Sequence, residues 1–286
     1  LRWASPALVE ATRDAETARR FAHLRRRHPA FVLDVDGSPW STVHPLVARG
    51  LRPRVEVGAD PLQADLLDRA LAWHRAAGNL REPVALLLGA DRWTEAVDLL
   101  VNSALRVAEE ARHHEFLDLW QEIPSAAWEH DHAAILTLAL IQLGAGRAES
   151  AIDLLFRPPL TDFDLPAGIR AVAEVIQALL SSWSPDPAGG HAAAERALER
   201  LARLEPADLP AVTGVRANDP WRHLAHVGAG RAEIVLGRAP AAVRRLGALA
   251  DDETLGPLVR LNQMASYARA LAVCGRLDDA TEQAAA

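Results

Sequence analysis

The stretch from residue 133 to 155 constrains the fold more than any other part of the sequence. Apolar side chains cover nearly every side of residues 135–143, which predicts a buried helix. The sequence Gly-Ala-Gly-Arg at 144–147 interrupts that helix, and apolar residues then recur at helical spacing up to Leu155. Ala148 and Ala151 are small enough to let the second helix lie close to the first. One such hairpin cannot bury both of its faces, so it needs similar neighbours.

The same order of elements recurs three more times toward the C-terminus. An apolar helix leads through a glycine into a helix rich in small residues, over 171–204, 221–249 and 258–280. With Gly146, Gly190, Gly237 and Gly275 as markers, the steps are 44, 47 and 38 residues. Tetratricopeptide repeats are about 34 residues long and HEAT or armadillo repeats about 40–47. The predicted fold is therefore mainly α, an α-α superhelix or tetratricopeptide-like solenoid with irregular loops.

The N-terminal part has a different sequence pattern, with signals for strands as well as helices. Residues 7–28 favour a helix, 30–35 a short strand, and 40–43 a return strand after the turn signal Asp36-Gly37. Pro45 is placed to start a helix that ends near residue 51. Helices followed by a β-hairpin are typical of the C-terminal end of a winged-helix domain. We expect a winged-helix remnant over 1–52, a linker over 53–60 and helical repeats over 61–286.

Four further helices are expected between the linker and the hairpin at 133–155. Pro61 follows an N-capping Asp60 and opens the first, which stops at Gly78-Asn79. The others are predicted at the ranges 80–88, 91–107 and 116–123.

Composition limits the classes of function. The net charge is −7 and every basic residue is an arginine. A phosphate-binding loop requires a lysine, so we expect no ATPase centre in this chain. The charge gives no general attraction to nucleic acid or an anionic membrane. One cysteine, Cys274, no signal peptide and no apolar run long enough for a membrane span favour a cytoplasmic protein. The abrupt ends suggest a piece of a larger chain.

Several short motifs resemble the MalT-like, LuxR-type regulators of the STAND ATPase class. They are Trp-Ser-Thr-Val-His-Pro-Leu-Val at 40–47, Leu-Ala-Trp-His at 71–74, Gly-Ala-Asp-Arg-Trp-Thr-Glu-Ala-Val-Asp-Leu-Leu at 89–100, and Leu-Trp-Gln-Glu-Ile-Pro at 119–124. The resemblance covers roughly residues 30–155. It departs from the family where aromatic residues flank the His-Pro pair, since Ser41, Val43 and Val47 stand there.

The resemblance implies a function for the whole chain. It would be the signal-sensing, protein-interacting arm of an ATP-dependent transcription regulator, binding a small-molecule inducer or a regulatory protein, with self-association as a further expectation. His44 would contact the phosphates of ADP held by a domain upstream of this chain, or else simply cap the following helix. ATP or ADP is expected only in that upstream domain, and direct DNA binding is not expected here.

The first helices of the predicted hairpins carry polar stripes. In tetratricopeptide solenoids such helices line the concave groove, so the stripes would form a polar trough for a sugar-like or peptide ligand. The alternative is an ordinary solvated helix face. The candidate ligand-binding residues are Arg170, Glu174, Gln177 and Ser181, then His223, His226 and Glu233, then Arg260, Gln263 and Tyr267, with Trp183 and Trp221 near the edges.

No other constellation favours chemistry. His130 and His132 flank an aspartate, but their spacing and the lack of a second ligand group favour a solvated helix start over a metal site. No nucleophile-elbow sequence is present, so we expect no catalysis. Two rival functions stay open. One is a stand-alone tetratricopeptide-like scaffold that binds peptides without a transcriptional role; the other, an enzyme on helical repeats, would need a buried acid pair.

Overall fold

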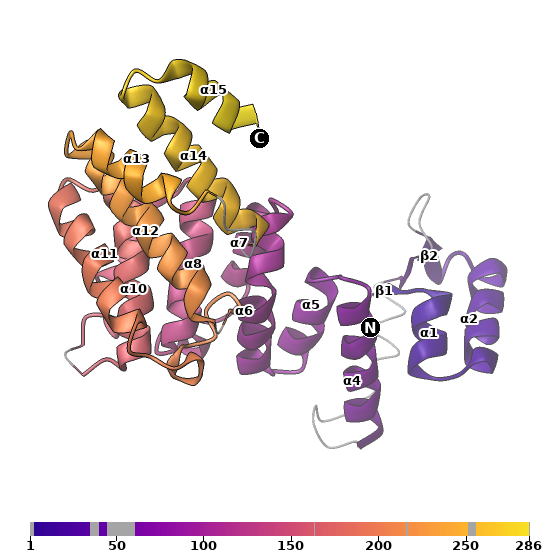
Figure 1. Cartoon of the computed structure of the whole chain (residues 1–286). Helices are drawn as coiled ribbons and strands as arrows, with labels where there is room; N and C mark the ends of the chain where they lie inside the picture. The colour runs from indigo at the N-terminus through magenta and orange to yellow at the C-terminus, as the bar shows by residue number, and fades with distance from the viewer. Residues whose placement is uncertain are drawn as a thin grey trace. The chain divides into compact units, whose positions relative to one another are not determined.

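The computed structural model describes residues 3–34, 40–44, 61–162, 164–215, 217–250 and 256–285. Figure 1 shows a mainly helical chain with one small antiparallel sheet near its N-terminus. Both features were predicted from the sequence. The chain divides into two compact units, Leu1–Ala96 and Val97–Ala286. No helix of the described ranges is long and apolar enough to cross a membrane.

The first unit begins with two helices and a sheet. The elements are β1 (Trp3–Ala4), α1 (Pro6–Thr12), α2 (Ala15–Arg27), β2 (Val32–Asp34) and β3 (Ser41–Val43). The sheet has the order β1-β3-β2, with all neighbours antiparallel. The predicted return strand is confirmed. The turn at 36–37, the helix expected after His44 and the linker at 53–60 lie outside the described residues.

The single helix expected over 7–28 is wrong, because the structure has two. Asp14 separates α1 from α2 in an extended conformation, and its carboxylate accepts the backbone N–H of Thr17 at 2.6 Å. This bond lowers the pKa of Asp14. An aspartate that satisfies a free N–H of the first turn starts a new helix more favourably than it continues an old one.

Two more helices, α4 (Pro61–Ala76) and α5 (Arg81–Gly89), belong to the same unit. α4 contacts α1. The His74 ring is buried and stacks on Trp40 with centroids 5.7 Å apart, while Trp73 meets the same two rings edge-on. Burial lowers the pKa of His74, and its Nδ1 lies 3.1 Å from the Asn79 amide nitrogen. An aromatic cluster therefore packs α4 with the segment that follows the predicted hairpin turn.

The second unit is built from helices alone in its described residues, apart from one isolated bridge between Val212 and Val215. α6 (Trp93–Glu109) spans the boundary between the units. The helices that follow are α7 (His113–Gln121), α8 (His132–Gly144), α9 (Ala148–Leu155), α10 (Ala167–Leu179), α11 (Pro187–Leu201), α12 (Asn218–Val235), α13 (Ala239–Gly247), α14 (Pro257–Val273) and α15 (Leu277–Ala285).

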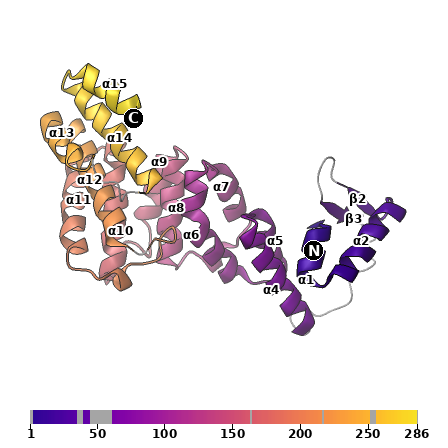
Figure 2. The ribbon, with the colours of Figure 1, turned by 45° about the vertical axis from the view of Figure 1, so that its right-hand side comes forward.

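Contacts in this unit run between sequence neighbours. α8 packs with α9, α10 with α11, α12 with α13, and α14 with α15. The first helices of these pairs also touch in series, α8 with α10, α10 with α12, and α12 with α14. Figures 1 and 2 both show this stack of pairs running from α8 to α15.

Three of the expected turns have the geometry that favours glycine. Gly146, Gly237 and Gly275 have φ of 76°, 73° and 77°, in the left-handed region that side chains disfavour. In each turn the next residue is an arginine whose N–H reaches back into the preceding helix, as in the 2.8 Å bond from Arg147 to the Gln142 carbonyl. This is the pattern of a Schellman C-cap.

The fourth expected turn is wrong. Gly189 and Gly190 lie within the first turn of α11, because Pro187 occupies its first position and Asp186 caps it, accepting the Gly189 N–H at 2.8 Å. Gly190 has another role: a Cβ there would lie 2.7 Å from that of Ser181. The glycine marks a close approach between α11 and the end of α10, and the expected marker spacings of 44 and 47 residues do not measure turn-to-turn distances.

Two turns of the same kind escaped the sequence analysis because they lack glycine. Asp91 and Ala111 both have φ of 55°. Arg92 and Arg112 follow them and pair with an acid three residues further on, Glu95 and Glu115 respectively. An arginine follows all five of these turns, whereas glycine lies within only three of them; the similar turn at Gly78 is followed by Asn79.

Candidate functional site

The helix pairs α10–α11 and α12–α13 each hold a buried glutamate against arginines. Glu174 on α10 accepts hydrogen bonds from Arg196 Nε at 2.9 Å and Arg200 Nε at 3.0 Å, both on α11. The two arginines are one helical turn apart, so one face of α11 reaches both carboxylate oxygens. A buried carboxylate requires such compensation.

The second buried glutamate has a larger network. Glu233 on α12 accepts from Arg245 Nε of α13 at 3.1 Å, and its side chain is only 6% exposed. Arg245 also binds Glu195 of α11 through Nη2 at 2.8 Å. The His191 ring nitrogen lies 3.3 Å from the same Glu233 oxygen. The other carboxylate oxygen of Glu233 is buried with no hydrogen-bond partner among the described residues.

His226 borders this network on α12. Its Nδ1 lies 3.3 Å from Arg245 Nη1. Burial, followed by the positive charge of Arg245, lowers the pKa of His226. The ring is therefore neutral at pH 7 and accepts a hydrogen bond from Arg245. His226 thus adds no positive charge beside Arg245.

The structure corrects the expected open trough. Glu174, Ser181, Glu233 and Gln263 are buried between helices and do not face solvent. Ser181 Oγ lies 3.4 Å from the Gly228 carbonyl, and the Gln263 amide donates to the Leu246 carbonyl at 2.8 Å. The polar stripe faces neighbouring helices because these side chains satisfy one another and the backbone there.

The remaining stripe residues divide by exposure. Arg170, Gln177, His223 and Tyr267 are half-buried, and Arg260 is exposed on α14. His223 Nδ1 lies 2.8 Å from the Asp219 carbonyl, one turn earlier in its own helix.

The two tryptophans expected at the edges of the trough differ from each other. Trp221 is 2% exposed, and its indole nitrogen has no hydrogen-bond partner among the described residues, so it belongs to the core. Trp183 follows the short 3-10 helix Leu180–Ser182 after α10; it is 55% exposed, and it alone of the pair remains available at a surface.

His44 lies just after β3, where its backbone N–H donates to the Phe31 carbonyl at 2.8 Å. That bond extends the strand pairing by one residue. The expected contact of His44 with ADP involves a domain upstream of this chain, so it stays a prediction.

The described residues contain no group of three or more His, Cys, Asp or Glu side chains arranged to hold a metal ion. Asp131 instead caps α8, accepting the N–H groups of Ala133 and Ala134 at 2.9 and 3.2 Å. His130 is 86% exposed in its side chain. The segment behaves as the start of a helix.

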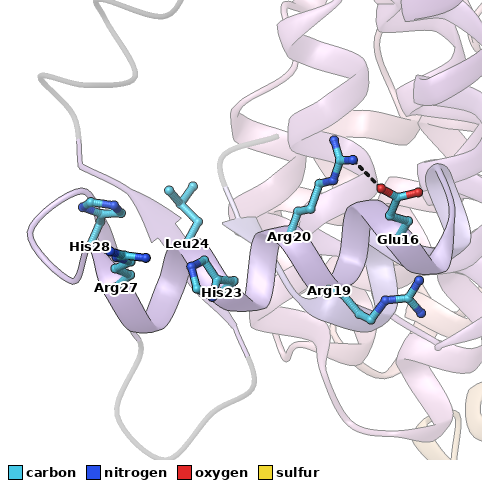
Figure 3. Close-up of a pocket in the computed structure, with 7 residues that line it drawn as sticks. All are labelled: Glu16, Arg19, Arg20, His23, Leu24, Arg27 and His28. Carbon is cyan, nitrogen blue, oxygen red and sulfur yellow. Dashed lines mark hydrogen bonds and ion pairs between the residues drawn. The ribbon is translucent and has the colours of Figure 1, made fainter.

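A basic surface follows α2. A depression of about 510 Å³ lies beside Arg19, Arg20, His23 and Arg27. Figure 3 shows these side chains, with Arg20 paired to Glu16. All of its described lining residues come from α2 and its C-cap residue His28. A single helix gives no opposing wall among the described residues, so this surface does not enclose a ligand.

Sequence reasoning missed one cluster, at the contact of α12 with α14. Arg231 on α12 donates from Nε to Ser266 Oγ at 3.0 Å and from Nη2 to Asn262 Oδ1 at 2.9 Å. Both acceptors are uncharged. Desolvation by burial, followed by the positive charge of Arg269, lowers the pKa of Arg231 to about 10. The available signal was the alignment of residues 262, 266 and 269 on one face of α14.

No protein-family model matches the chain, and comparison with curated proteins and with solved structures finds no match either.

Proposed function

We propose that this chain is the sensing and protein-interacting arm of a regulator, built as a tetratricopeptide-like solenoid. The observation that carries the proposal is the serial contact of α8, α10, α12 and α14, each paired with the helix that follows it. Stacks of helix pairs expose long continuous surfaces to which ligands and partner proteins bind. A small-molecule inducer or a regulatory protein would bind there, and self-association would use the same kind of surface.

The N-terminal sheet supports the winged-helix part of the proposal. Two helices precede the β2–β3 hairpin, and the short β1 pairs with β3, giving the order β1-β3-β2. A winged-helix domain ends in a strand order of this kind. We assign the described residues before α4 to such a domain, and His44 at the end of β3 to the resembled family's nucleotide-sensing position.

The regulatory role follows from the sequence resemblance together with this architecture. An arm of this kind would change shape or dynamics when its ligand binds, and would pass that change to an ATPase domain and to DNA-binding parts elsewhere. The chain itself supplies the binding surface and the coupling through packed helices. We do not assign a reaction to it.

The decisive experiment is to inactivate the gene that encodes this chain in its own organism and to measure all transcripts. A limited group of transcripts should change, and expression of the wild-type gene should restore them. A second strain should carry Arg245→Met in the chromosomal gene, with Arg244→Met as the matched control. The first substitution should reproduce part of the change, because it breaks the packed network; the second removes an exposed charge and should not.

Unchanged transcripts in the inactivated strain would contradict the regulatory role. If partner proteins were still retained by the purified chain in that case, the chain would be the peptide-binding scaffold named above.

A further inference from the structure

Arg231 differs from the other arginines that join helices of the second unit. Arg196 and Arg200 share Glu174, and Arg245 binds Glu233 and Glu195. Arg231 is half-buried where α12 contacts α14, and its described partners are the neutral Ser266 and Asn262. Burying a charge without an opposite charge is costly. Among the described residues, the positive charge of Arg231 has no acidic partner at this helix contact.

The guanidinium is held in a fixed orientation. Asn262 donates its amide N–H to the Leu258 carbonyl at 3.0 Å, which directs its oxygen to Arg231. Ser266 donates its hydroxyl to the Asn262 carbonyl at 2.7 Å, which leaves its oxygen lone pairs to accept from Arg231. The N–H of Asn262 and the O–H of Ser266 are thus already donated to backbone carbonyls of α14. A group fixed in this way loses little entropy when it binds a ligand.

The guanidinium also retains binding capacity. Arginine has five N–H donors, of which Ser266 and Asn262 occupy one each. The described hydrogen bonds of Arg231 use Nε and Nη2, and none is described for Nη1. A ligand oxygen that binds Nη1 would leave the bonds to Ser266 and Asn262 in place.

A second cation adds to the field. Arg269 lies on α14 close enough to Arg231 to lower its pKa, and it is exposed. Ser266 and Arg269 are three residues apart and share one face of the helix. Arg231 and Arg269 each carry one positive charge, and the described hydrogen-bond partners of Arg231 are neutral, which suits a ligand carrying two negative charges. A phosphate monoester carries about −1.5 to −2 at pH 7 and offers three oxygens to arginine.

We propose that Arg231 and Arg269, with Asn262 and Ser266 as orienting groups, form a binding site for the phosphate-monoester group of a small molecule. The site lies on the helical-repeat arm, and its biological meaning rests on the function proposed above. Arg231 provides the fixed bond at the wall of the site, and Arg269 closes on the phosphate from solvent. Neutralising the pair would strengthen the α12–α14 contact, so ligand binding and packing of the last helix pairs are coupled.

The test uses the full 286-residue chain. Phenyl phosphate is titrated into it at constant ionic strength, and binding is followed by calorimetry and by the Nε–H resonance of Arg231. Saturable binding with a shifted Arg231 resonance is expected. Arg231→Gln should weaken it at least about tenfold, the loss of one charge-assisted bond pair, and Arg269→Gln by less. Arg244→Gln removes one exposed charge elsewhere and should leave binding unchanged.

Three results would overturn the site. Equal binding by the wild type and Arg231→Gln would place the phosphate elsewhere. Binding that disappears when the sodium chloride concentration is raised would show only general attraction between opposite charges. A phosphoserine peptide that binds more than about tenfold tighter than phenyl phosphate would assign the site to a phosphoprotein and not a small molecule.

Two further points keep the test decisive. If Arg231→Gln does not fold, the wild-type Nε–H titration still reports whether phosphate reaches that side chain, and an unshifted resonance contradicts the proposal. Failure of phosphate binding would leave the transcript experiment untouched, because that experiment depends on the regulatory role and not on the class of ligand.

Discussion

The two sides of α12 are stabilised in opposite ways. Toward α10 and α11, Ala229 is buried with Ala178 and Ala194, and the His191 ring of α11 lies 3.3 Å from Glu233. On the α13 side, Glu233 is neutralised by Arg245. Toward α14 the same helix presents Arg231 to neutral acceptors. Among the described residues, the buried charge of Glu233 has a partner of opposite charge, whereas the charge of Arg231 has none. We call the side of α12 that carries Glu233 the complete side. Packing of the first kind provides stability, and a surplus charge of the second kind provides a place for a ligand.

The largest destabilisation is expected from Arg245→Met, which removes the arginine that pairs with Glu233 on the complete side. Glu233 would remain buried with only His191 beside it, and removing one partner of a buried ion pair costs about 3–5 kcal/mol. We expect a loss near the lower end, about 3 kcal/mol, because Arg245 is 22% exposed. Urea denaturation measures it. Arg244→Met is the control, since Arg244 is exposed on the same helix. Equal losses from the two variants would mean that the network contributes nothing specific.

Gly228→Ala tests the tight contact with α10. A Cβ on Gly228 would lie 2.7 Å from that of Ala178 and 2.8 Å from the Ala178 carbonyl carbon, so backbone must move. Overpacking of this kind costs about 1–3 kcal/mol, and we expect about 2. Gly89, the last residue of α5, has nothing within 4 Å of the corresponding position, so the control Gly89→Ala should not lower the free energy of unfolding. A neutral Gly228→Ala would show that α10 and α12 are not so close.

Gly146→Val separates backbone strain from packing. Nothing lies within 4 Å of a Cβ at Gly146, yet its φ of 76° is left-handed. The expected cost is about 1–2 kcal/mol from the backbone alone. Ala145→Val, one residue earlier, should cost less, since Ala145 has a φ of −78°. Amide exchange should show weaker protection of α8 and also of α10, which contacts it. Equal effects of the two variants, or loss confined to one turn, would contradict the coupling of neighbouring pairs.

Acidification should weaken the complete side. The pKa of His226 is lowered in the folded state from its ordinary value of 6.5, so the unfolded chain binds the proton more readily. Its contribution to stability is present above pH 6.5 and is lost as the pH falls through the lower folded value. Denaturation at pH 7.5 and pH 5 should show a smaller pH difference for His226→Gln than for the wild type. His74 and His113 shift in the same direction, so part of the pH dependence should remain.

The smallest effect is expected from Arg231→Met without phosphate present. This change removes a charge that has no counter-ion among the described residues, and methionine fills a similar volume. Apolar replacements for buried ionic groups are often neutral or stabilising. We expect a change between about zero and a gain of 1 kcal/mol in urea denaturation, against the large loss for Arg245→Met. A loss as large as that of Arg245→Met would remove the distinction between the two sides of α12.

Local chemistry in the sequence determined most of the helices. Apolar spacing placed α8, α9, α12 and α14 closely, and the glycines at 146, 237 and 275 marked real left-handed turns. The hairpin strands followed from their composition. Local reasoning was wrong at Asp14 and at Gly190, where a capping aspartate overrode the apparent pattern. A cap acts through two or three backbone bonds, so it was visible in the sequence, although the pattern of apolar residues concealed it.

The tertiary structure alone decided which polar side chains are available to a ligand. Glu174 and Arg170 stand in one stripe in the sequence, yet the first is buried against α11 and the second is half-buried. Periodicity reports that residues share a face of a helix, but it does not report what lies opposite that face. Whether an arginine meets a carboxylate, as Arg245 does, or an amide, as Arg231 does, depends on the register between helices far apart in the sequence. That register is set by the packing of small residues, and it leaves no periodic signal of its own.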